Sequence, residues 1–121
     1  MSRIRLYFDE DAMHEALLVA LRARRVDAVT ALECGMVNHG DEQHLVCSSD
    51  AGRVLFSYNI RDFSTLHARW LASGREHGEL ILAVQRRYSV GEQLRRVLQI
   101  INRRSAEEMR SQVEYLSSWG S

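Results

Sequence analysis

The chain has 121 residues, a length that suits one domain of ordinary size. Hydrophobic residues make up 45% of it, which is typical of a folded core and excludes a disordered segment. The formal net charge is zero, so no overall field attracts the protein toward nucleic acid or a membrane surface. No apolar run approaches the roughly 18 residues of a membrane span, and no signal peptide is recognisable. We expect one cytoplasmic domain over residues 1–121.

The basic residues are all arginine, 16 in number, and lysine is absent. Guanidinium groups match phosphate oxygens with two parallel hydrogen bonds, so local arginine clusters remain candidates for contact with a nucleic-acid backbone. The two cysteines, Cys34 and Cys47, are too few for a disulfide framework or a zinc motif. We expect them to be reduced thiols.

Apolar residues alternate between strand-like and helix-like spacing along the first 84 residues. This pattern predicts strands at 4–8, 26–30, 53–58 and 79–84, and helices at 12–25, 41–51 and 62–73. Residues 31–40, between the second strand and the second helix, are expected to form a loop. Strands that alternate with helices predict a parallel sheet with helices packed on it.

The C-terminal third is predicted to be helical. Ser89 with Glu92, and Ser105 with Glu108, fit the capping-box pattern at the start of a helix. Two apolar stripes follow these caps, one made of Leu94, Val97, Leu98 and Ile101, the other of Met109, Val113, Leu116 and Trp119. The predicted fold is therefore a three-layer, Rossmann-like α/β fold with a mostly parallel sheet of about four strands and a helical C-terminal third.

Three groups of polar side chains fall where the predicted strands end or a helix begins. They are Asp9, Glu10 and Asp11; Asp41 and Glu42; and Asn59 and Asp62. Ligands of open parallel sheets bind beyond the carboxyl ends of the strands, so we expect these groups to converge there. Clustered carboxylates repel one another, and a fold retains them at low cost when a cation neutralises them. Hard oxygen ligands favour Mg²⁺ or Mn²⁺.

Each of these residues also has a structural interpretation. Asp11, Asp41 and Asp62 could each cap the amino end of a helix. Glu10 is expected to point into solvent, away from its aspartate neighbours, and Asn59 could occupy a turn. The metal-site hypothesis rests on the placement of all three groups at one end of the sheet.

Four stretches with these residues resemble the PIN-like nuclease superfamily, above all small stand-alone bacterial PIN-like proteins thought to be toxins of toxin–antitoxin pairs. The stretches are LYFDEDA (6–12), GDEQHL (40–45), GRVLFSYNIRDF (52–63) and HGELIL (77–82). The resemblance implies a Rossmann-like sheet and a Mg²⁺- or Mn²⁺-dependent endoribonuclease that hydrolyses RNA phosphodiester bonds. It also implies an antitoxin protein as partner.

The resemblance assigns roles to individual residues. Asp9, Asp41 and Asp62 match the first, middle and last metal-binding acids of the family. Asn59 stands where relatives often carry another aspartate, and we expect it to bind the ion through its amide oxygen. Because this departure removes one negative charge, an alternative function is a catalytically degenerate PIN-like module that binds a partner protein or RNA without cleavage.

Substrate contacts are expected from two further residues. Arg61 lies between Asn59 and Asp62, and His77 precedes the fourth strand, where the resemblance places a recurrent histidine near the same sheet end. Other arginines that could contact an RNA backbone are Arg53, Arg75, Arg86, Arg87, Arg95, Arg96, Arg103 and Arg104. The remaining histidines, His14, His39, His44 and His67, show no zinc spacing and are expected at the surface or on helices.

Two other phosphate chemistries share part of this pattern. Receiver domains and haloacid-dehalogenase-type phosphatases also place acids after a first strand, but both normally require a lysine, which this chain lacks. DNA cleavage remains an alternative within the nuclease class, because the sequence does not reveal whether a 2′-hydroxyl is recognised.

The C-terminal third also suggests association. Together, the stripes and the aromatic residues Tyr115 and Trp119 offer more apolar surface than one small sheet needs to cover it, which predicts a homodimer or an antitoxin-binding surface over residues 89–119.

Overall fold

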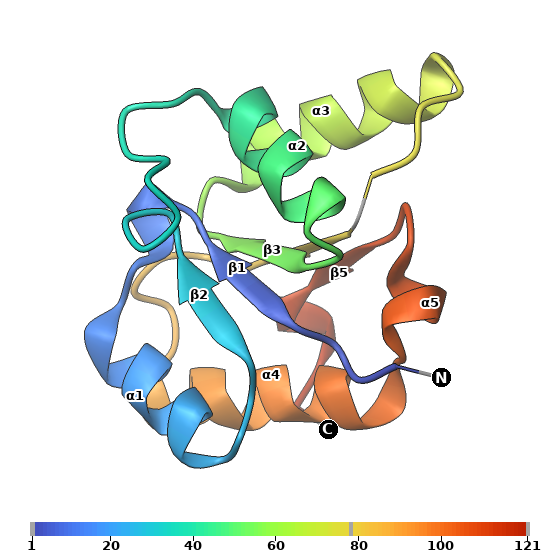
Figure 1. Ribbon diagram of the computed structural model, residues 1–121. Helices are drawn as coiled ribbons and strands as arrows, with labels where there is room; N and C mark the ends of the chain where they lie inside the picture. Colours follow the sequence, from blue (N-terminus) through green and yellow to red (C-terminus); the bar gives the residue numbers. More distant parts are fainter. Residues whose placement is uncertain (1, 78, 121) are drawn as a thin grey trace.

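The computed structural model of the protein describes residues 2–77 and 79–120 (Figure 1). Its strands are β1 (Leu6–Phe8), β2 (Ala28–Thr30), β3 (Val54–Ser57), β4 (Leu80–Leu82) and β5 (Val113–Tyr115). They form a sheet in the order β2-β1-β3-β4-β5, and every neighbouring pair is parallel. The predicted α/β class with a parallel central sheet is confirmed, with five strands in the described residues where about four were expected.

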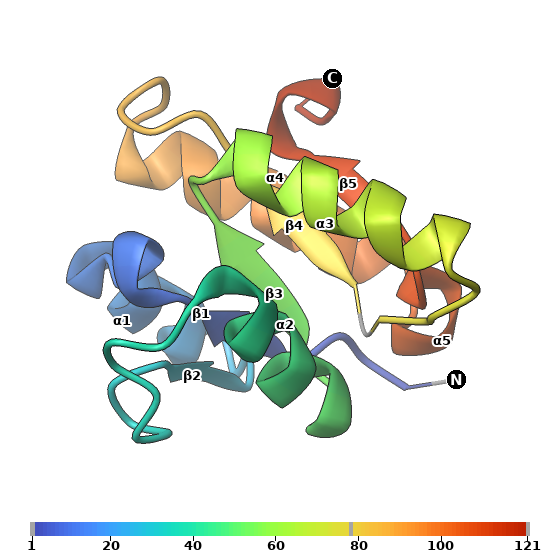
Figure 2. The same cartoon turned by 90° about the horizontal axis from the view of Figure 1, so that it is seen from above.

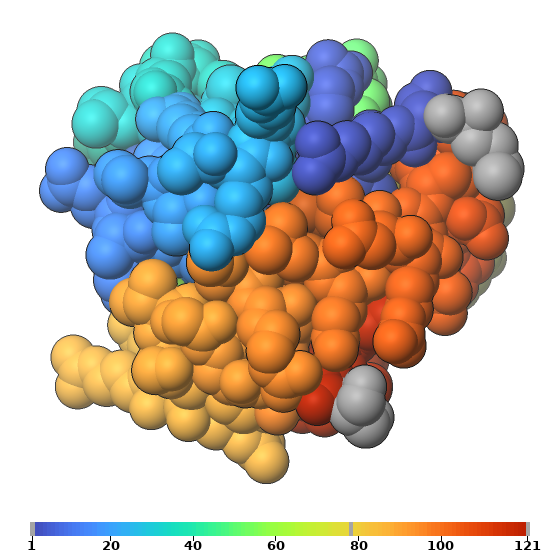
Figure 3. Space-filling view, turned by 90° about the horizontal axis from the view of Figure 1, so that it is seen from below, coloured from blue at the N-terminus to red at the C-terminus, as the bar shows by residue number. Residues whose placement is uncertain are grey.

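Helices cover both faces of the sheet, which makes three layers. They are α1 (Glu15–Ala23), α2 (Asp41–Asp50), α3 (Ile60–Ala72), α4 (Val90–Arg103) and α5 (Ala106–Met109), with short 3-10 helices at Glu10–Ala12 and Leu116–Ser118. Helices α2 and α3 lie on one face (Figure 2), and α1 and α4 pack together on the other (Figures 1 and 3). Within the described residues, no helix is long and apolar enough to cross a membrane.

The strands are apolar on both sides because both sides are buried. Leu6, Phe8 and Phe56 point toward α1 and α4, whereas the alternate residues Tyr7 and Leu55 point toward α2 and α3. The rings of Phe8 and Phe56 lie side by side on neighbouring strands, with centroids 5.0 Å apart. This packing fixes the register of β1 against β3, and thereby the position of the residues that follow each strand.

The aspartates Asp11, Asp41 and Asp62 do not cap the helices, so the capping interpretation is wrong. The N-cap positions of α1, α2 and α3 are instead occupied by His14, Gly40 and Asn59. Asp41 and Asp62 lie within the first turns of their helices, where the helix dipole favours a negative charge. The predicted serine caps are confirmed at α4 and α5, where Ser89 and Ser105 accept backbone N–H bonds.

The second apolar stripe of the C-terminal third is not one helix. Helix α5 ends at Met109, Ser111 adopts a positive φ of 57°, and the chain then enters strand β5 beside β4. Residues spaced three or four apart suit either structure over so short a segment, and the open edge of β4 offers hydrogen bonds that favour a strand. The prediction of helix through Trp119 is therefore wrong.

The apolar residues of the C-terminal third are largely used inside the chain. Leu94, Val97 and Ile101 are buried against the sheet and α1. The Trp119 side chain packs on the same core, and Tyr115 remains 37% exposed. Much of the apolar surface that motivated a homodimer or an antitoxin-binding surface over residues 89–119 is thus buried within the chain, and both partners stay predictions.

Candidate functional site

Strands β1 and β3 are neighbours, and the chain leaves them toward opposite faces of the sheet. Strand β1 leads to α1 on one face, and β3 leads to α3 on the other, so a crevice forms beyond their carboxyl ends. Asp9 follows β1 directly and is only 2% exposed. Asn59 follows β3, and Asp41 begins α2 at the same edge of the sheet.

One hydrogen-bonded network joins the three predicted acids. Ser57, the last residue of β3, donates from Oγ to Asp9 Oδ2 at 2.8 Å and accepts the Asn59 backbone N–H at 2.9 Å. The Asn59 amide nitrogen donates to Asp41 Oδ2 at 3.1 Å and to Asp62 Oδ2 at 3.0 Å. The oxygens of Asp41 and Asp62 are therefore no more than about 6 Å apart. The expected convergence of Asp9, Asp41 and Asp62 is observed, and Ser57 is a connecting residue that the sequence analysis missed.

The Asn59 amide is oriented opposite to the prediction. Its oxygen accepts the Asp62 backbone N–H at 3.4 Å as the N-cap of α3, and its nitrogen faces the two carboxylates. The NH₂ group thus occupies the position between carboxylates where a cation would otherwise balance their charge. Asn59 can bind an ion through its oxygen only if its amide turns and the cap of α3 is lost.

Burial and repulsion both act on the acids. Burial raises the pKa of Asp9 to about 7, with smaller contributions from Asp11 and Asp41, although the Ser57 hydrogen bond opposes this shift. The pKa of Asp41 is also raised, first by burial and then by Asp62 and Asp11. Asp9 Oδ1 is buried and has no hydrogen-bond partner among the described residues. Such an oxygen is destabilising when charged and favours a cationic ligand.

A second chain of polar contacts holds the loop beside the site. The Tyr7 hydroxyl lies 2.8 Å from Nδ1 of His44, which is 2% exposed, and His44 Nε2 lies 3.3 Å from Glu10 Oε1. Burial raises the pKa of Tyr7, so its hydroxyl stays protonated beside Nδ1. The same Glu10 oxygen accepts the Asn38 N–H at 2.5 Å. Glu10 is therefore an anchor for the loop, and its predicted solvent-facing position is wrong.

These two networks border one hollow of about 390 Å³. Its lining includes the carboxyl groups of Asp9, Glu10, Asp11 and Asp41, together with Asn38 and His44. We call it the acidic hollow. With four carboxyl groups in its wall, it suits a cation better than an anion.

His77 lies elsewhere. It precedes β4, whereas the acids follow β1 and β3, so in a parallel sheet it belongs to the opposite, amino edge. Its Nε2 is 2.7 Å from Nδ1 of His67, and it is only 2% exposed. Burial lowers the pKa of His77 to about 4, and His67 adds to this effect. The prediction that His77 lies near the acids and contacts substrate there is wrong.

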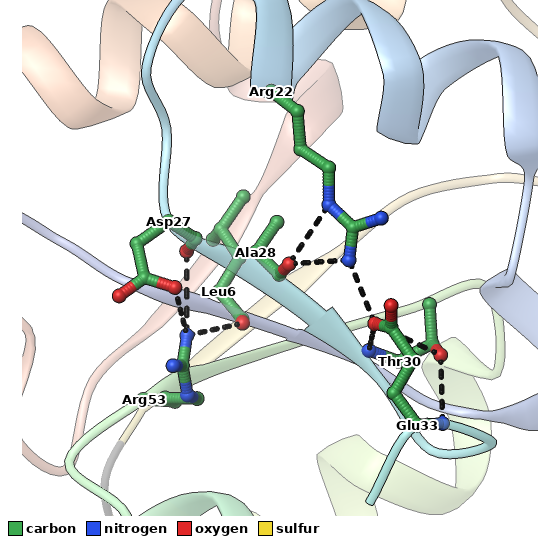
Figure 4. A network of polar contacts seen from close by, with 7 residues as sticks. All are labelled: Leu6, Arg22, Asp27, Ala28, Thr30, Glu33 and Arg53. Atoms are coloured by element: carbon green, nitrogen blue, oxygen red, sulfur yellow. Dashed lines mark hydrogen bonds and ion pairs between the residues drawn. The ribbon is translucent and has the colours of Figure 1, made fainter.

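Arg53, a predicted RNA contact, also lies at the amino edge of the sheet, where its side chain forms hydrogen bonds within the chain. Its guanidinium donates to the carbonyl of Leu6 at 3.2 Å and to Asp27 Oδ1 at 2.9 Å (Figure 4). Arg22 has a similar role at β2, where it donates to the carbonyl of Ala28 (Figure 4). These arginines complete backbone hydrogen bonding around the edge strand.

Arg61 keeps its predicted position, exposed in the first turn of α3 beside Asp62. Most other predicted RNA contacts have partners within the chain: Arg75 stacks on Trp70, Arg95 and Arg96 pair with Glu92, and Arg103 and Arg104 lie near the ring of Trp119. Arg61 thus lies next to Asp62, one of the acids of the hydrogen-bonded network.

The site has the ligand types for a hard cation but is not assembled around one. Within residues 2–77 and 79–120, no three His, Cys, Asp or Glu side chains are arranged to hold a metal ion together. The Asn59 amide between Asp41 and Asp62 accounts for part of this spacing.

Comparison with known proteins adds no relative: no protein-family model, curated protein or solved structure matches the chain. The resemblance to PIN-like nucleases therefore stays a prediction based on the four stretches, and the function has to be argued from the site.

Proposed function

We propose that the protein is a Mg²⁺- or Mn²⁺-dependent endoribonuclease of PIN-like type, in which Asp9, Asp41 and Asp62 hold the metal ion. One observation carries the proposal: a single hydrogen-bonded network joins these three side chains beyond the carboxyl ends of β1 and β3. The resemblance further supports the role of a toxin with an antitoxin protein as partner.

The donor set supports a divalent cation. The unpartnered, buried Oδ1 of Asp9 and the raised pKa values of Asp9 and Asp41 describe carboxyl groups that are costly to ionise without a counter-charge. When bound, the cation would offset their charge, polarise a water and stabilise charge on the phosphate under attack. Asn59 would join the ligands through its amide oxygen after the rotation described above.

The other residues have positioning roles in this proposal. Arg61 holds the scissile phosphate or its neighbour, because its exposed guanidinium lies in the first turn of α3 with Asp62. Glu10, anchored by His44, keeps the loop around Asn38 at the wall of the hollow. Because the protein has no net charge and few free arginines near the hollow, RNA binding is expected to be weak and sensitive to salt.

The second candidate is a module that binds RNA or a partner protein without cleavage. The observation that favours it is the Asn59 amide, which already separates and satisfies the carboxylates of Asp41 and Asp62. A site balanced by an amide has less need of a cation than one with a fourth aspartate.

The test compares wild type, Asp9→Asn and the control Asp50→Asn, an exposed aspartate at the end of α2. We expect wild type and the control to cleave single-stranded RNA in the presence of Mn²⁺ and to lose this activity when a chelator is added. The cleavage rate of Asp9→Asn should be lower by at least about a hundredfold. Mn²⁺ should raise the melting temperature of wild type and not of Asp9→Asn. RNA binding that survives chelation and Asp9→Asn, with no product at high protein concentration, would favour the binding module.

A further inference from the structure

A second hollow, also of about 390 Å³, opens at the opposite edge of the sheet. Its lining includes Arg3, Arg5, Arg110, Glu79 and Glu107. Arg5 directly precedes β1, Glu79 directly precedes β4, and Arg110 lies shortly before β5, so the amino ends of parallel strands bring these residues together. We call it the basic hollow.

The arginines of the basic hollow keep most of their donors. Arg3 uses Nη1 for the carbonyl of Arg25 at 3.2 Å, and Arg5 uses Nη2 for the carbonyl of Ala51 at 2.8 Å. A guanidinium has five N–H groups, so these backbone contacts orient the two side chains without exhausting them. The contacts thus preorganise the arginines for an anion.

Glu79 is an unusual neighbour for three arginines. It is only 5% exposed, and burial raises its pKa to about 8, although Arg110 opposes this shift. At neutral pH the side chain is therefore mostly an uncharged acid that can donate a hydrogen bond. Glu107, in contrast, remains a carboxylate because it accepts the Ser2 N–H at 2.7 Å, which lowers its pKa. Three guanidinium groups against one carboxylate leave a formal charge of +2 on the lining.

We propose that the basic hollow binds a phosphate monoester, with Arg3, Arg5 and Arg110 holding its oxygens. A monoester carries about −1.5 to −2 charges at pH 7, which balances the lining, whereas a phosphodiester within an RNA chain carries only about −1. The guanidinium fork matches the phosphate oxygens, and the Glu79 acid supplies a donor where a carboxylate would repel the ligand. The volume suits a mononucleotide-sized ligand. This site is separate from the acidic hollow and does not depend on the nuclease proposal.

The first test measures binding of adenosine 5′-monophosphate by calorimetry. Arg110→Gln should weaken binding about tenfold or more, since a charge-assisted hydrogen bond is lost. The control Arg24→Gln removes an exposed arginine at the C-cap of α1 that also donates to a backbone carbonyl, and it should leave the affinity unchanged. Equal affinities of Arg110→Gln and Arg24→Gln, equal binding of adenosine without phosphate, or no binding at millimolar ligand would overturn the proposal.

The second test uses Glu79→Gln, which keeps the shape and removes the ionisation. Between pH 7.5 and 9, wild-type affinity should fall several-fold more than that of Glu79→Gln, because only the wild-type side chain ionises. The phosphate is already a dianion over this range, and the α-amino group of the chain, which acts on Glu107, titrates equally in both proteins, so the difference between the two profiles reports Glu79. Parallel pH profiles for the two proteins would contradict the role of Glu79 and with it the proposal.

Two further ligands separate the sources of the phosphate. A 5′-phosphorylated tetranucleotide and the same tetranucleotide with a 5′-hydroxyl are titrated beside the mononucleotide. Preference for the phosphorylated form assigns the hollow to the end of an RNA strand, and binding of the mononucleotide alone assigns it to a free metabolite. Equal binding of both tetranucleotides would show contact with internal phosphodiesters and overturn the monoester assignment.

Discussion

The two hollows have the same volume of about 390 Å³ and opposite charge, and they differ in how their charged groups are held. In the acidic hollow, short side chains are fixed by Ser57 and Asn59, and Asp9 is buried without charge compensation. In the basic hollow, long arginine side chains reach in from an exposed rim. Removing the charge of Asp9 should therefore change the stability of the protein, whereas removing an arginine charge from the basic hollow should change only ligand affinity.

The largest stability effect is expected for Asp9→Asn in metal-free protein. The pKa of Asp9 is about 7 in the folded state against 3.8 when unperturbed, so its stabilising contribution is full below pH 3.8 and is lost as the pH rises through 7. Asparagine does not ionise, so the variant should gain up to about 4 kcal/mol over wild type at pH 8 and little at pH 4. Urea unfolding at pH 4 and at pH 8 measures the free energy of unfolding of both proteins. Arg110→Gln should differ from wild type by less than about 0.5 kcal/mol at either pH, and an equal gain for Asp9→Asn at both pH values would contradict the burial argument.

The next effect is expected for Asn59→Asp, which replaces the bridging donor with a third carboxylate. Without metal, repulsion from Asp41 and Asp62 should lower the free energy of unfolding by about 1–3 kcal/mol. With Mn²⁺ the loss should reverse, and the ion should bind at least about tenfold more tightly than to wild type. Melting temperatures with and without Mn²⁺ report both changes. Asn102→Asp, on the exposed end of α4, is the matched control. Its free energy of unfolding and its affinity for Mn²⁺ should both equal those of wild type. If Mn²⁺ does not raise the melting temperature of Asn59→Asp, Asn59 is not part of the metal site.

A smaller effect is expected for Tyr7→Phe, which leaves Nδ1 of buried His44 without its hydrogen-bond partner. The cost should be about 1–2 kcal/mol. Because His44 supports Glu10, and Glu10 accepts the Asn38 N–H, exchange of that amide with solvent should accelerate. Tyr58→Phe removes a comparable hydrogen bond of 2.6 Å to α4 and should cost similar stability without affecting the Asn38 amide. Equal exchange rates in the two variants would show that the polar chain does not hold the loop.

The smallest stability effect is expected for Arg61→Gln, because its side chain is exposed. The free energy of unfolding should change by less than about 0.5 kcal/mol. If RNA binds as proposed, affinity should fall about equally for all sequences, and the slope of log affinity against log salt should decrease by about one. Arg69→Gln, an exposed arginine in the last turn of α3, should leave the slope unchanged and serves as control.

The first 84 residues could be predicted well because local and global signals agree there. Strands such as β3 are continuous apolar runs buried on both sides, and polar residues stand directly at their ends. Because the carboxyl ends of parallel strands lie at the same edge of a sheet, the sequence alone could predict that Asp9, Asp41 and Asp62 lie at one edge. The same rule, applied strictly, would also have placed His77 at the amino edge, since it precedes its strand.

The remaining features depend on contacts that leave no local signal. Strand β5 has only three residues, and its spacing does not distinguish a strand from a helix. Tyr7, Glu10 and His44 come from three separate elements, β1, the 3-10 helix after it and α2, so no local pattern in the sequence announces their contacts. The direction of the Asn59 amide is decided by three hydrogen-bond partners from two helices, which no motif encodes.

The parallel order of the strands has a consequence for how the chain folds. The interior strand β1 pairs with β3, about fifty residues later, and Ser2 is hydrogen-bonded to Ala106 and Glu107 near the other end of the sequence. Contacts of such long sequence separation form slowly. Until β5 docks, the backbone of β4 offers an unpaired edge that another chain can join. The protein should therefore be most prone to aggregate during refolding, before its last strand closes the sheet.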